Sequence, residues 1–289
     1  MHSNKMPTYA LLGATGSTGS SVLRRLLQTA SETDSFSVNI LVRSRPKLLG
    51  MFPGLDQRRS PTVRIFQGES TNPELLDAVL HNASILFMCV GQNGSPMGMT
   101  LVQDSAVAVV DALRRQRRHQ GSACTVIQLR SASLNPALSV QVPRLVHRLV
   151  SFCLFAGYSD LRRACEVWHD ASLAGLLQYV LVDPPTLHDA DGRRATGHEL
   201  IIAESQTICL SYADLGVALC EIADRALEFQ GKAVGVTATG PVRHTWGVLL
   251  GYLAQGGMAH LQYRHGKEKL IVVGIGLVLI LGCLYVTIP

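Results

Sequence analysis

A glycine-rich turn near the N-terminus constrains the fold of this chain more than any other feature. The segment Gly13-Ala-Thr-Gly16-Ser-Thr-Gly19 directly follows the apolar run Tyr9–Leu12 and opens a helical pattern, with GxxGxxG rather than GxGxxG spacing. In a strand–turn–helix unit, such glycines permit a tight turn, close approach of a pyrophosphate and close packing of helix on strand. The amides at the start of the helix face the phosphate charge. We therefore predict a dinucleotide-binding turn whose cofactor contacts come from Gly13, Thr15, Gly16, Ser17, Thr18 and Gly19.

The rest of the chain alternates short apolar runs with helical stretches. The expected strands are 9–12, 38–42, 63–66, 85–90, 125–129, 178–182, 207–210 and 233–236. Helices are expected after the glycine turn and over 73–80, up to about 118, over 160–173 and over 213–226. Near-continuous apolar strands that alternate with helices are typical of a parallel sheet covered on both faces. The fold class predicted is α/β, a doubly wound, Rossmann-like parallel sheet.

The residues after the second expected strand indicate which dinucleotide binds. An acidic residue there would hydrogen-bond the ribose hydroxyls of NAD. This chain has Arg43 and Arg45 with Lys47 close behind, and no carboxylate. A guanidinium offers a planar fork suited to a 2′-phosphate, so NADP is the predicted cofactor. The alternative is a solvated loop whose charge is incidental.

Composition and cysteine usage exclude several classes of protein. Charged residues are 16% and hydrophobic residues 47% of the chain, a balance unlike that of disordered chains. The net charge of +5 is too small for a histone-like nucleic-acid binder, and the arginines of 114–118 fit a solvated helix end better than a nucleic-acid patch. Seven cysteines without a CxxC pair favour free thiols in a reducing compartment. Neither a metal site nor a nucleic-acid partner is predicted.

The C-terminal segment from Leu270 to Ile288 contains no charged residue. As a helix it would span about 28 Å, close to the thickness of the hydrocarbon core of a bilayer. Arg264, Lys267 and Lys269 form a basic flank upstream that is expected to stay cytoplasmic. We predict a domain over 1–245, an amphipathic, basic neck over 246–269 and a transmembrane tail anchor over 270–288. The protein would then be single-pass, with its main domain in the cytoplasm, at the endoplasmic reticulum. The alternative is a buried C-terminal helix or strand pair.

Over about residues 8–240, the chain resembles NmrA-like atypical short-chain dehydrogenases of fungal secondary metabolism. The resemblance rests on the Gly13–Gly19 turn and on five further features, which are Arg43, Gly68-Glu69, Val90-Gly91, Val182-Asp-Pro-Pro-Thr-Leu187 and Ser211-Tyr-Ala-Asp214. It implies that Glu69 lies near the adenine and that Gly91 lies along the cofactor.

The resemblance also implies where catalysis would occur. Reductases of the wider family use serine with Tyr-x-x-x-Lys, and here Leu129-Arg130-Ser131 and Tyr158-Ser-Asp-Leu-Arg162 take those places, without the lysine. Similar reductases of prenylated indole alkaloid pathways also lack the tetrad, carry an arginine matched by Arg130, and reduce an iminium. We expect Tyr158 to donate a proton and Arg130 to stabilise developing charge.

Three helical residues are further candidates near the reaction site. The acidic helix residue of the alkaloid-pathway reductases would fall near Cys165, so Asp160 or Glu166 is expected to substitute for it. Trp168 would either line an aromatic pocket or pack in the core.

The sequence thus predicts an NADP(H)-dependent oxidoreductase that acts on a lipophilic carbonyl or iminium intermediate held under residues Leu187–Leu200. Two alternatives stay open. One is an NmrA-like regulator that binds NAD(P) without turnover, which the missing lysine favours. The other is a non-redox isomerase or cyclase on the same fold.

Overall fold

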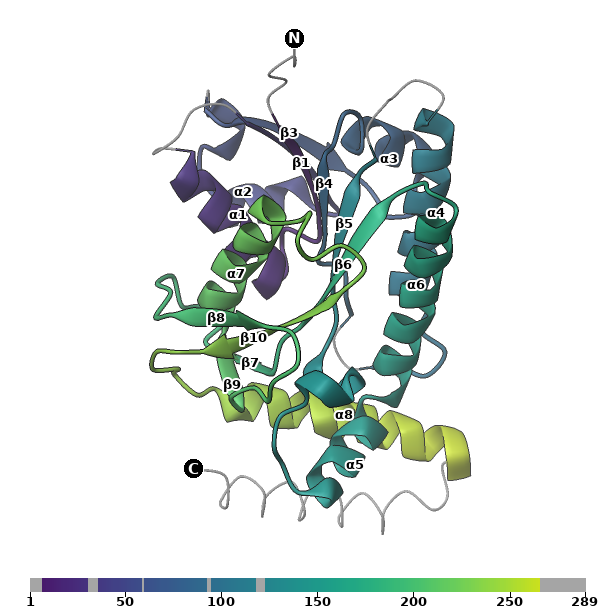
Figure 1. The fold of residues 1–289 in the computed structure, drawn as a ribbon, viewed down its shortest axis with the longest axis vertical. Helices are drawn as coiled ribbons and strands as arrows, with labels where there is room; N and C mark the ends of the chain where they lie inside the picture. The colour runs from purple at the N-terminus through teal and green to yellow at the C-terminus, as the bar shows by residue number, and fades with distance from the viewer. Residues whose placement is uncertain (1–6, 31–35, 59, 93–94, 118–122, 266–289) are drawn as a thin grey trace.

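A mostly parallel sheet forms the centre of the molecule (Figure 1), which is described by a computed structural model over residues 7–30, 36–58, 60–92, 95–117 and 123–265. Its eight strands follow the order β3-β2-β1-β4-β5-β6-β10-β8, and only β8 is antiparallel to its neighbour. The strands are β1 (Thr8–Leu12), β2 (Ser37–Val42), β3 (Thr62–Gln67), β4 (Ile85–Met88), β5 (Thr125–Leu129), β6 (Gln178–Asp183), β8 (His198–Ile201) and β10 (Ala233–Ala238). A separate pair is formed by β7 (Thr186–His188) and β9 (Cys209–Ser211). The predicted doubly wound sheet is confirmed.

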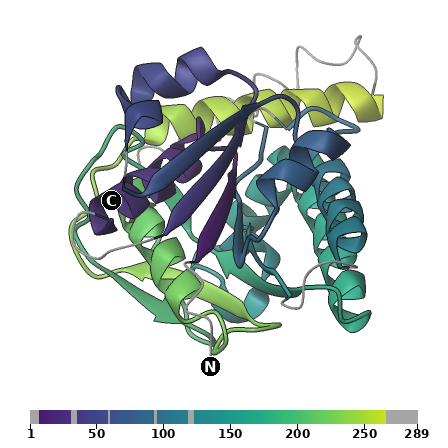
Figure 2. The ribbon, with the colours of Figure 1, turned by 90° about the horizontal axis from the view of Figure 1, so that it is seen from above.

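Helices cover both faces of the sheet (Figure 2). The eight α-helices described are α1 (Ser17–Thr29), α2 (Arg45–Met51), α3 (Pro73–Val79), α4 (Leu101–Gln116), α5 (Arg144–Cys153), α6 (Phe155–Leu173), α7 (Tyr212–Asp224) and α8 (Trp246–His265). Leu11 of β1 packs with α1 and α7, whereas its neighbours Ala10 and Leu12 pack with α3, α4 and α6. Since successive side chains of a strand point to opposite faces, both faces are buried, as the continuous apolar strands predict.

Local sequence explains where several helices begin. The Asn72 side chain accepts a hydrogen bond from the Leu75 amide at 2.9 Å, and Pro73 occupies the first helical position of α3. Ser211 accepts from the Asp214 amide at the start of α7 in the same way. The α6 helix begins at Phe155 rather than at the predicted residue 160, because its first turns pack against α5 and α8.

Helices α5 and α8 form a layer across one end of the sheet (Figure 1), and neither was predicted as a helix. They pack on each other through a small apolar cluster that includes Cys153 and Leu253. The close crossing requires glycine at position 256, because a Cβ there would lie 2.1 Å from the Cys153 carbonyl oxygen. Most of the segment expected as a neck, 246–269, therefore is a helix docked on the domain.

Two of the helical candidates for the site are structural. The Asp160 carboxylate is fully buried and accepts hydrogen bonds from the Val102 and Gln103 amides, both at 2.9 Å, at the start of α4. Trp168 is also fully buried and donates from Nε1 to Gln128 at 2.9 Å, so it is a core residue rather than part of a pocket wall. Glu166 is exposed on α6. None of the three lines the cavity described below.

The predicted transmembrane tail, 270–288, lies outside the described residues. Among the helices that the structure does describe, none combines the length and the apolar character needed to cross a bilayer.

Replacing Asp160 by alanine should destabilise the fold without removing a catalytic group. The change leaves two amides at the start of α4 without their buried acceptor, which should cost about 2 kcal/mol of unfolding free energy. Urea denaturation measures this loss, and the exposed Glu166→Ala variant is the control, expected to change stability little. An Asp160→Ala protein of unchanged stability would contradict the capping role.

Candidate functional site

One large cavity, of about 1130 Å³, lies at the carboxyl ends of the central strands. The strand order reverses between β1 and β4, and open α/β sheets bind ligands outside such a reversal. The cavity runs from the glycine turn past the ends of β4 and β5 to the layer formed by α5 and α8. Its position is that of a dinucleotide site with further space beyond it.

The glycine turn shows why this chain needs glycine at position 13. Gly13 has φ +90°, and a Cβ there would lie 2.4 Å from the Cys89 carbonyl oxygen at the end of β4. The turn is closed by the Gly16 amide, which donates to the Gly13 carbonyl at 3.0 Å. This geometry brings bare backbone to the cavity, which is the surface that a pyrophosphate requires.

The start of α1 fits an anion. Gly16 precedes the helix without a side chain that could cap it, and the first turn holds no acidic residue. The first amides of the helix are therefore open to a phosphate, which the helix dipole also favours. Tyr212 of α7 lines the cavity beside Ser17, and burial raises the pKa of Tyr212, an effect that hydrogen bonding to Ser17 partly opposes.

The basic residues after β2 divide into two groups. Arg43 and Lys47 line the cavity. Arg45 instead forms an ion pair with Asp56 at 3.2 Å and does not line it. Neither Arg43 nor Lys47 forms an ion pair with any of the described residues, so the two cations make a site suited to a phosphate on the adenosine ribose.

Most of the predicted cofactor residues meet in this cavity. Those that line it are Gly13, Thr15, Gly16, Ser17, Thr18, Arg43 and Gly91. Gly19 lies within α1 and packs against the Gly13 carbonyl instead of facing the cavity. Glu69 is exposed and does not line the cavity, although its neighbours Gly68 and Ser70 do. The adenine contact expected of Glu69 stays a prediction.

Tyr158 reaches the same cavity from α6. It is 8% exposed, and its hydroxyl lies 3.3 Å from the Ser131 hydroxyl that follows β5. Burial raises the pKa of Tyr158, while hydrogen bonds from Ser131 and Ser133 and the charge of Arg162 act in the opposite direction. The phenol is consequently protonated at neutral pH, and a proton can pass between the two hydroxyls.

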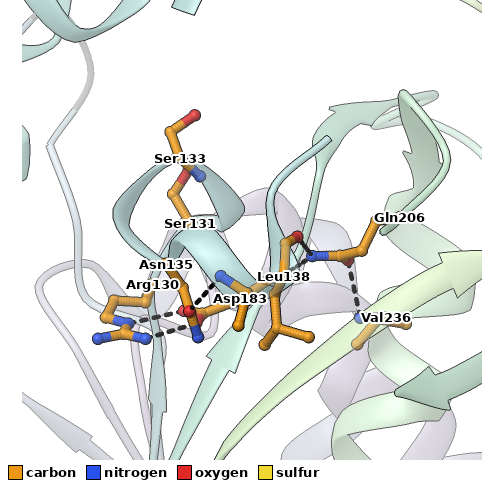
Figure 3. A network of polar contacts seen from close by, with 9 residues as sticks. Arg130, Ser131, Ser133, Asn135, Leu138, Asp183, Gln206 and Val236 are labelled. Atoms are coloured by element: carbon orange, nitrogen blue, oxygen red, sulfur yellow. Dashed lines mark hydrogen bonds and ion pairs between the residues drawn. The ribbon is translucent and has the colours of Figure 1, made fainter. Parts of the chain in front are cut away.

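Arg130 is held at the cavity wall by a buried carboxylate (Figure 3). Its Nε donates to one Asp183 oxygen at 2.6 Å and its Nη2 forms an ion pair with the other, and Asp183 is fully buried. The Asn135 amide also donates to Asp183, at 3.0 Å. Burial lowers the pKa of Arg130 and the bonds to Asp183 raise it, with a net increase. The guanidinium stays charged, but Asp183 balances that charge.

Gln206 extends this network to the neighbouring strand (Figure 3). Its amide nitrogen donates to the Asp183 carbonyl at 2.8 Å, and its amide oxygen accepts from the Val236 amide of β10 at 3.0 Å. The ends of β5, β6 and β10 are thereby joined below the cavity, so the Arg130–Asp183 pair has a rigid frame.

The far wall of the cavity is apolar and comes from α5 and α8. Its side chains include Val146, Val150, Leu154, Trp246, Leu249 and Leu253. The predicted cover, residues 187–200, contributes Leu187, Ala190 and Asp191. The predicted cover by residues 187–200 therefore forms only part of the wall, because α5 and α8 supply most of it.

A buried histidine fastens α8 to the rest of the site. His188 of β7 accepts a hydrogen bond at Nδ1 from the Thr245 amide, at 2.9 Å, and its ring lies 4.5 Å from the Trp246 ring. Burial and the nearby His244 lower the pKa of His188 to about 4, so the ring is neutral. His188 therefore fixes the first residues of α8 at the cavity wall.

The same histidine belongs to a group of metal-ligand residue types. The ligating atoms of His188, Cys209 and His244 lie within 4.8 Å of one another. Because Nδ1 of His188 accepts a hydrogen bond, the neutral ring carries its proton on Nε2 and offers no free lone pair. These contacts fit a packing role, and we assign no metal here.

Sequence reasoning missed several residues of the site. Lys47 was noted only as a neighbour of Arg43, and Tyr212 only as part of a strand–helix junction. A signal for Tyr212 existed, since it directly follows the Ser211 cap of a predicted helix. Apolar residues at helical spacing around Arg144 and Arg148 were a signal for α5, whereas the α8 residues gave none.

Comparisons with known proteins agree with this geometry. A family model described as NAD(P)H-binding matches residues 13–207. Averufin oxidase stcO of Emericella nidulans is 61% identical, over 98% of this chain and 99% of that protein. Averufin oxidase A of Aspergillus flavus is 58% identical, over 92% and 95%. A short-chain dehydrogenase/reductase of Veillonella parvula, solved in complex with NADP, has a TM-score of 0.62 at 19% identity, over 82% of this chain and 97% of that one.

Replacing Gly13 by alanine should abolish tight NADPH binding. The methyl group would clash with the Cys89 carbonyl in a backbone conformation that disfavours a side chain, so binding should weaken by up to about a hundredfold. Titration calorimetry with NADPH measures the effect. Gly54→Ala is the control, because Gly54 has φ +74° but open space around it. Equal NADPH affinity of the Gly13→Ala and Gly54→Ala proteins would contradict this site.

Charge reversal at Arg43 should remove a preference for NADPH over NADH. Loss of one charge-assisted phosphate contact should weaken NADPH binding about tenfold to a hundredfold and leave NADH binding nearly unchanged. Arg45→Glu, which alters a cation outside the cavity, should keep the preference. The dissociation constants of NADPH and NADH, measured for the wild-type protein and for both variants, test this prediction. A preference that survives Arg43→Glu would rule out this contact.

Proposed function

Since the chain belongs to the NAD(P)H-binding family and is an oxidoreductase, we propose that it uses NADP(H) to interconvert a lipophilic carbonyl compound and its alcohol. The observation that carries the proposal is the juxtaposition, in one cavity, of the Gly13 turn, the Arg43–Lys47 cations and the Tyr158 hydroxyl. When bound, the dinucleotide supplies or accepts the hydride. The glycine turn and the start of α1 would hold its pyrophosphate, and Arg43 and Lys47 its 2′-phosphate.

The hydroxyl pair favours a carbonyl over an iminium as the reducible group. Reduction of a carbonyl leaves an oxygen that must gain a proton, whereas reduction of an iminium needs hydride but little proton donation. Tyr158 and Ser131 form a hydrogen-bonded pair at the cavity wall, and the phenol is protonated at neutral pH. In this account Tyr158 gives its proton to the substrate oxygen, and Ser131 orients the phenol.

Arg130 has a different role from the one its position first indicates. The Nε and Nη2 groups of Arg130 both contact the Asp183 carboxylate, and this carboxylate balances the charge of the guanidinium. A neutralised guanidinium contributes little to stabilising an oxyanion. We assign Arg130 to positioning, since it anchors the segment that carries Ser131 directly after it.

The proposed substrate is averufin or a compound of similar size and lipophilicity. The names of the two fungal relatives point to averufin, and both are aligned with nearly the whole chain. The apolar wall of α5 and α8 provides burial for a largely hydrophobic molecule beyond the cofactor region. This substrate and the fungal secondary metabolism that it implies are part of the proposal.

Replacing Tyr158 by phenylalanine should lower turnover by about a hundredfold to ten-thousandfold, the usual contribution of general acid catalysis, with NADPH affinity unchanged. Nicotinamide absorbance, followed with NADPH and candidate carbonyl metabolites, averufin included, measures turnover. Tyr179→Phe is the control, because Tyr179 does not line the cavity. Tight cofactor binding without turnover on any candidate would favour the regulator, and product formation without an absorbance change would favour an isomerase or cyclase.

The pH dependence of the same reaction has a predicted sign. Reduction needs the protonated phenol, which is fully present below its pKa and is lost as pH rises through that value. Because burial raises the pKa of Tyr158 above the ordinary value of about 10, reduction should not decline between pH 7 and about 9 on account of this group. A fall in the wild-type rate over that range that is absent from Tyr158→Phe would contradict the assignment.

We also propose that residues 270–288 anchor the protein in a membrane, with the domain in the cytoplasm at the endoplasmic reticulum. The support is the uncharged sequence from Leu270 to Ile288 and its basic flank. An anchor there would keep the cavity close to lipophilic intermediates.

Deletion of residues 270–289 should move the protein from the carbonate-resistant membrane pellet to the soluble fraction. Cell fractionation with immunoblotting checks this result, and substitution of three polar residues for the last three is the control, which should stay in the pellet. A full-length protein found in the soluble fraction would contradict the anchor.

A further inference from the structure

Helices α5 and α8 carry several exposed or half-buried apolar and aromatic side chains. Leu145 is 74% exposed, and Arg148 and Phe152 follow it on the same side of α5 at helical spacing. The Phe152 and Phe155 rings lie 4.2 and 4.8 Å from the His260 ring of α8, and Tyr263 follows one turn later, 74% exposed. We call this surface the α5–α8 face, made of Leu145, Arg148, Phe152, Phe155, His260 and Tyr263.

The charge around this face is of one sign. Residues 136–159 and 229–265 contain no aspartate or glutamate, although the whole chain has 21 acidic residues. The cations there include Arg144, Arg148 and Arg264. Within the described part of the chain, no carboxylate lies within ion-pair distance of these three arginines. Exposed apolar and aromatic side chains among unpaired cations form the surface expected of a helix that lies on an anionic bilayer.

The outer side of α5 and the cavity wall are two sides of one helix. On α5, Val146 and Val150 line the cavity, whereas Leu145 and Arg148 do not. A helix with its side chains is about 10–12 Å across, so only that thickness separates the outer surface from the cavity. Beyond α8, the chain leads within a few residues to the uncharged sequence 270–288.

We propose that the α5–α8 face docks on the surface of an anionic phospholipid bilayer, and that a lipophilic substrate passes from the bilayer into the cavity beside these helices. The substrate part of this inference rests on the proposed function. A second copy of the chain is a weaker occupant, because two such basic faces would repel each other. Anchoring through residues 270–288 alone would leave Arg144, Arg148 and Arg264 without anionic partners.

Amide hydrogen exchange of the full-length protein tests the docking. With vesicles of phosphatidylcholine and phosphatidylserine, exchange in 144–155 and 246–265 should slow by about tenfold relative to the protein in detergent, and less with phosphatidylcholine alone. A chain held only by its tail would show no such protection.

A matched pair of double variants locates the contact. Leu145→Ser with Arg148→Glu should lose the protection of 144–155. Leu173→Ser with Arg64→Glu changes the same residue types at exposed positions on α6 and β3, and should keep it. Turnover of a substrate supplied without vesicles should be the same in both double variants, since none of the four residues lines the cavity.

Several results would overturn the docking. They are equal exchange with and without vesicles, equal protection by neutral and anionic vesicles, and protection that grows with protein concentration when no lipid is present, which would identify a second copy. Absence of turnover in the wild-type protein would instead refute the proposed function and leave the exchange result to be judged separately.

Discussion

The close approach of the β1–α1 turn to the end of β4 is the constraint on which the site depends. Gly13 adopts a positive φ with its α-carbon against the Cys89 carbonyl, where any side chain would clash. This contact occurs where the strand order reverses, so the crevice at the sheet edge begins with bare backbone and the amides of a helix N-terminus. The cations after β2 and the phenol from α6 then take their places along the same crevice.

The catalytic end of the crevice is stabilised by an ion pair that does not itself need to react. Asp183 is buried with Arg130, and a buried pair is costly unless its remaining hydrogen-bonding groups are satisfied. Asn135 donates to the Asp183 carboxylate, and Gln206 bonds the Asp183 backbone carbonyl and the Val236 amide, which links β6 to β10 beside the ion pair. The Tyr158 hydroxyl therefore has a fixed hydrogen-bond partner, the Ser131 hydroxyl. Ser131 can position the phenol in place of the missing lysine, but it does not supply the positive charge of a lysine.

Local pattern was enough to predict most of the sheet, the glycine turn, the Asn72 cap and the placement of Arg43, because each depends on residues near it in sequence, whereas the placement of Tyr158 came from the family resemblance. The burial of Trp168 and the capping of α4 by Asp160 could not be predicted, since both depend on partners about forty to sixty positions away. The α8 helix was missed because an apolar run without caps or a polar face resembles a membrane segment or a neck as closely as a docked helix, whereas α5 was missed although its apolar residues recur at helical spacing between basic ones. The exposure of Glu69 depends on the path of a loop.

Hydride transfer between NADP(H) and a carbon of a lipophilic substrate is the reaction proposed for this cavity. Mass spectrometry of the product formed with NADPH deuterated at the transferable C4 position of the nicotinamide tests it most directly. One deuterium, bonded to carbon, is expected in each product molecule, and the Gly13→Ala protein should form labelled product much more slowly at the same NADPH concentration. A product that forms at the wild-type rate without deuterium would contradict it.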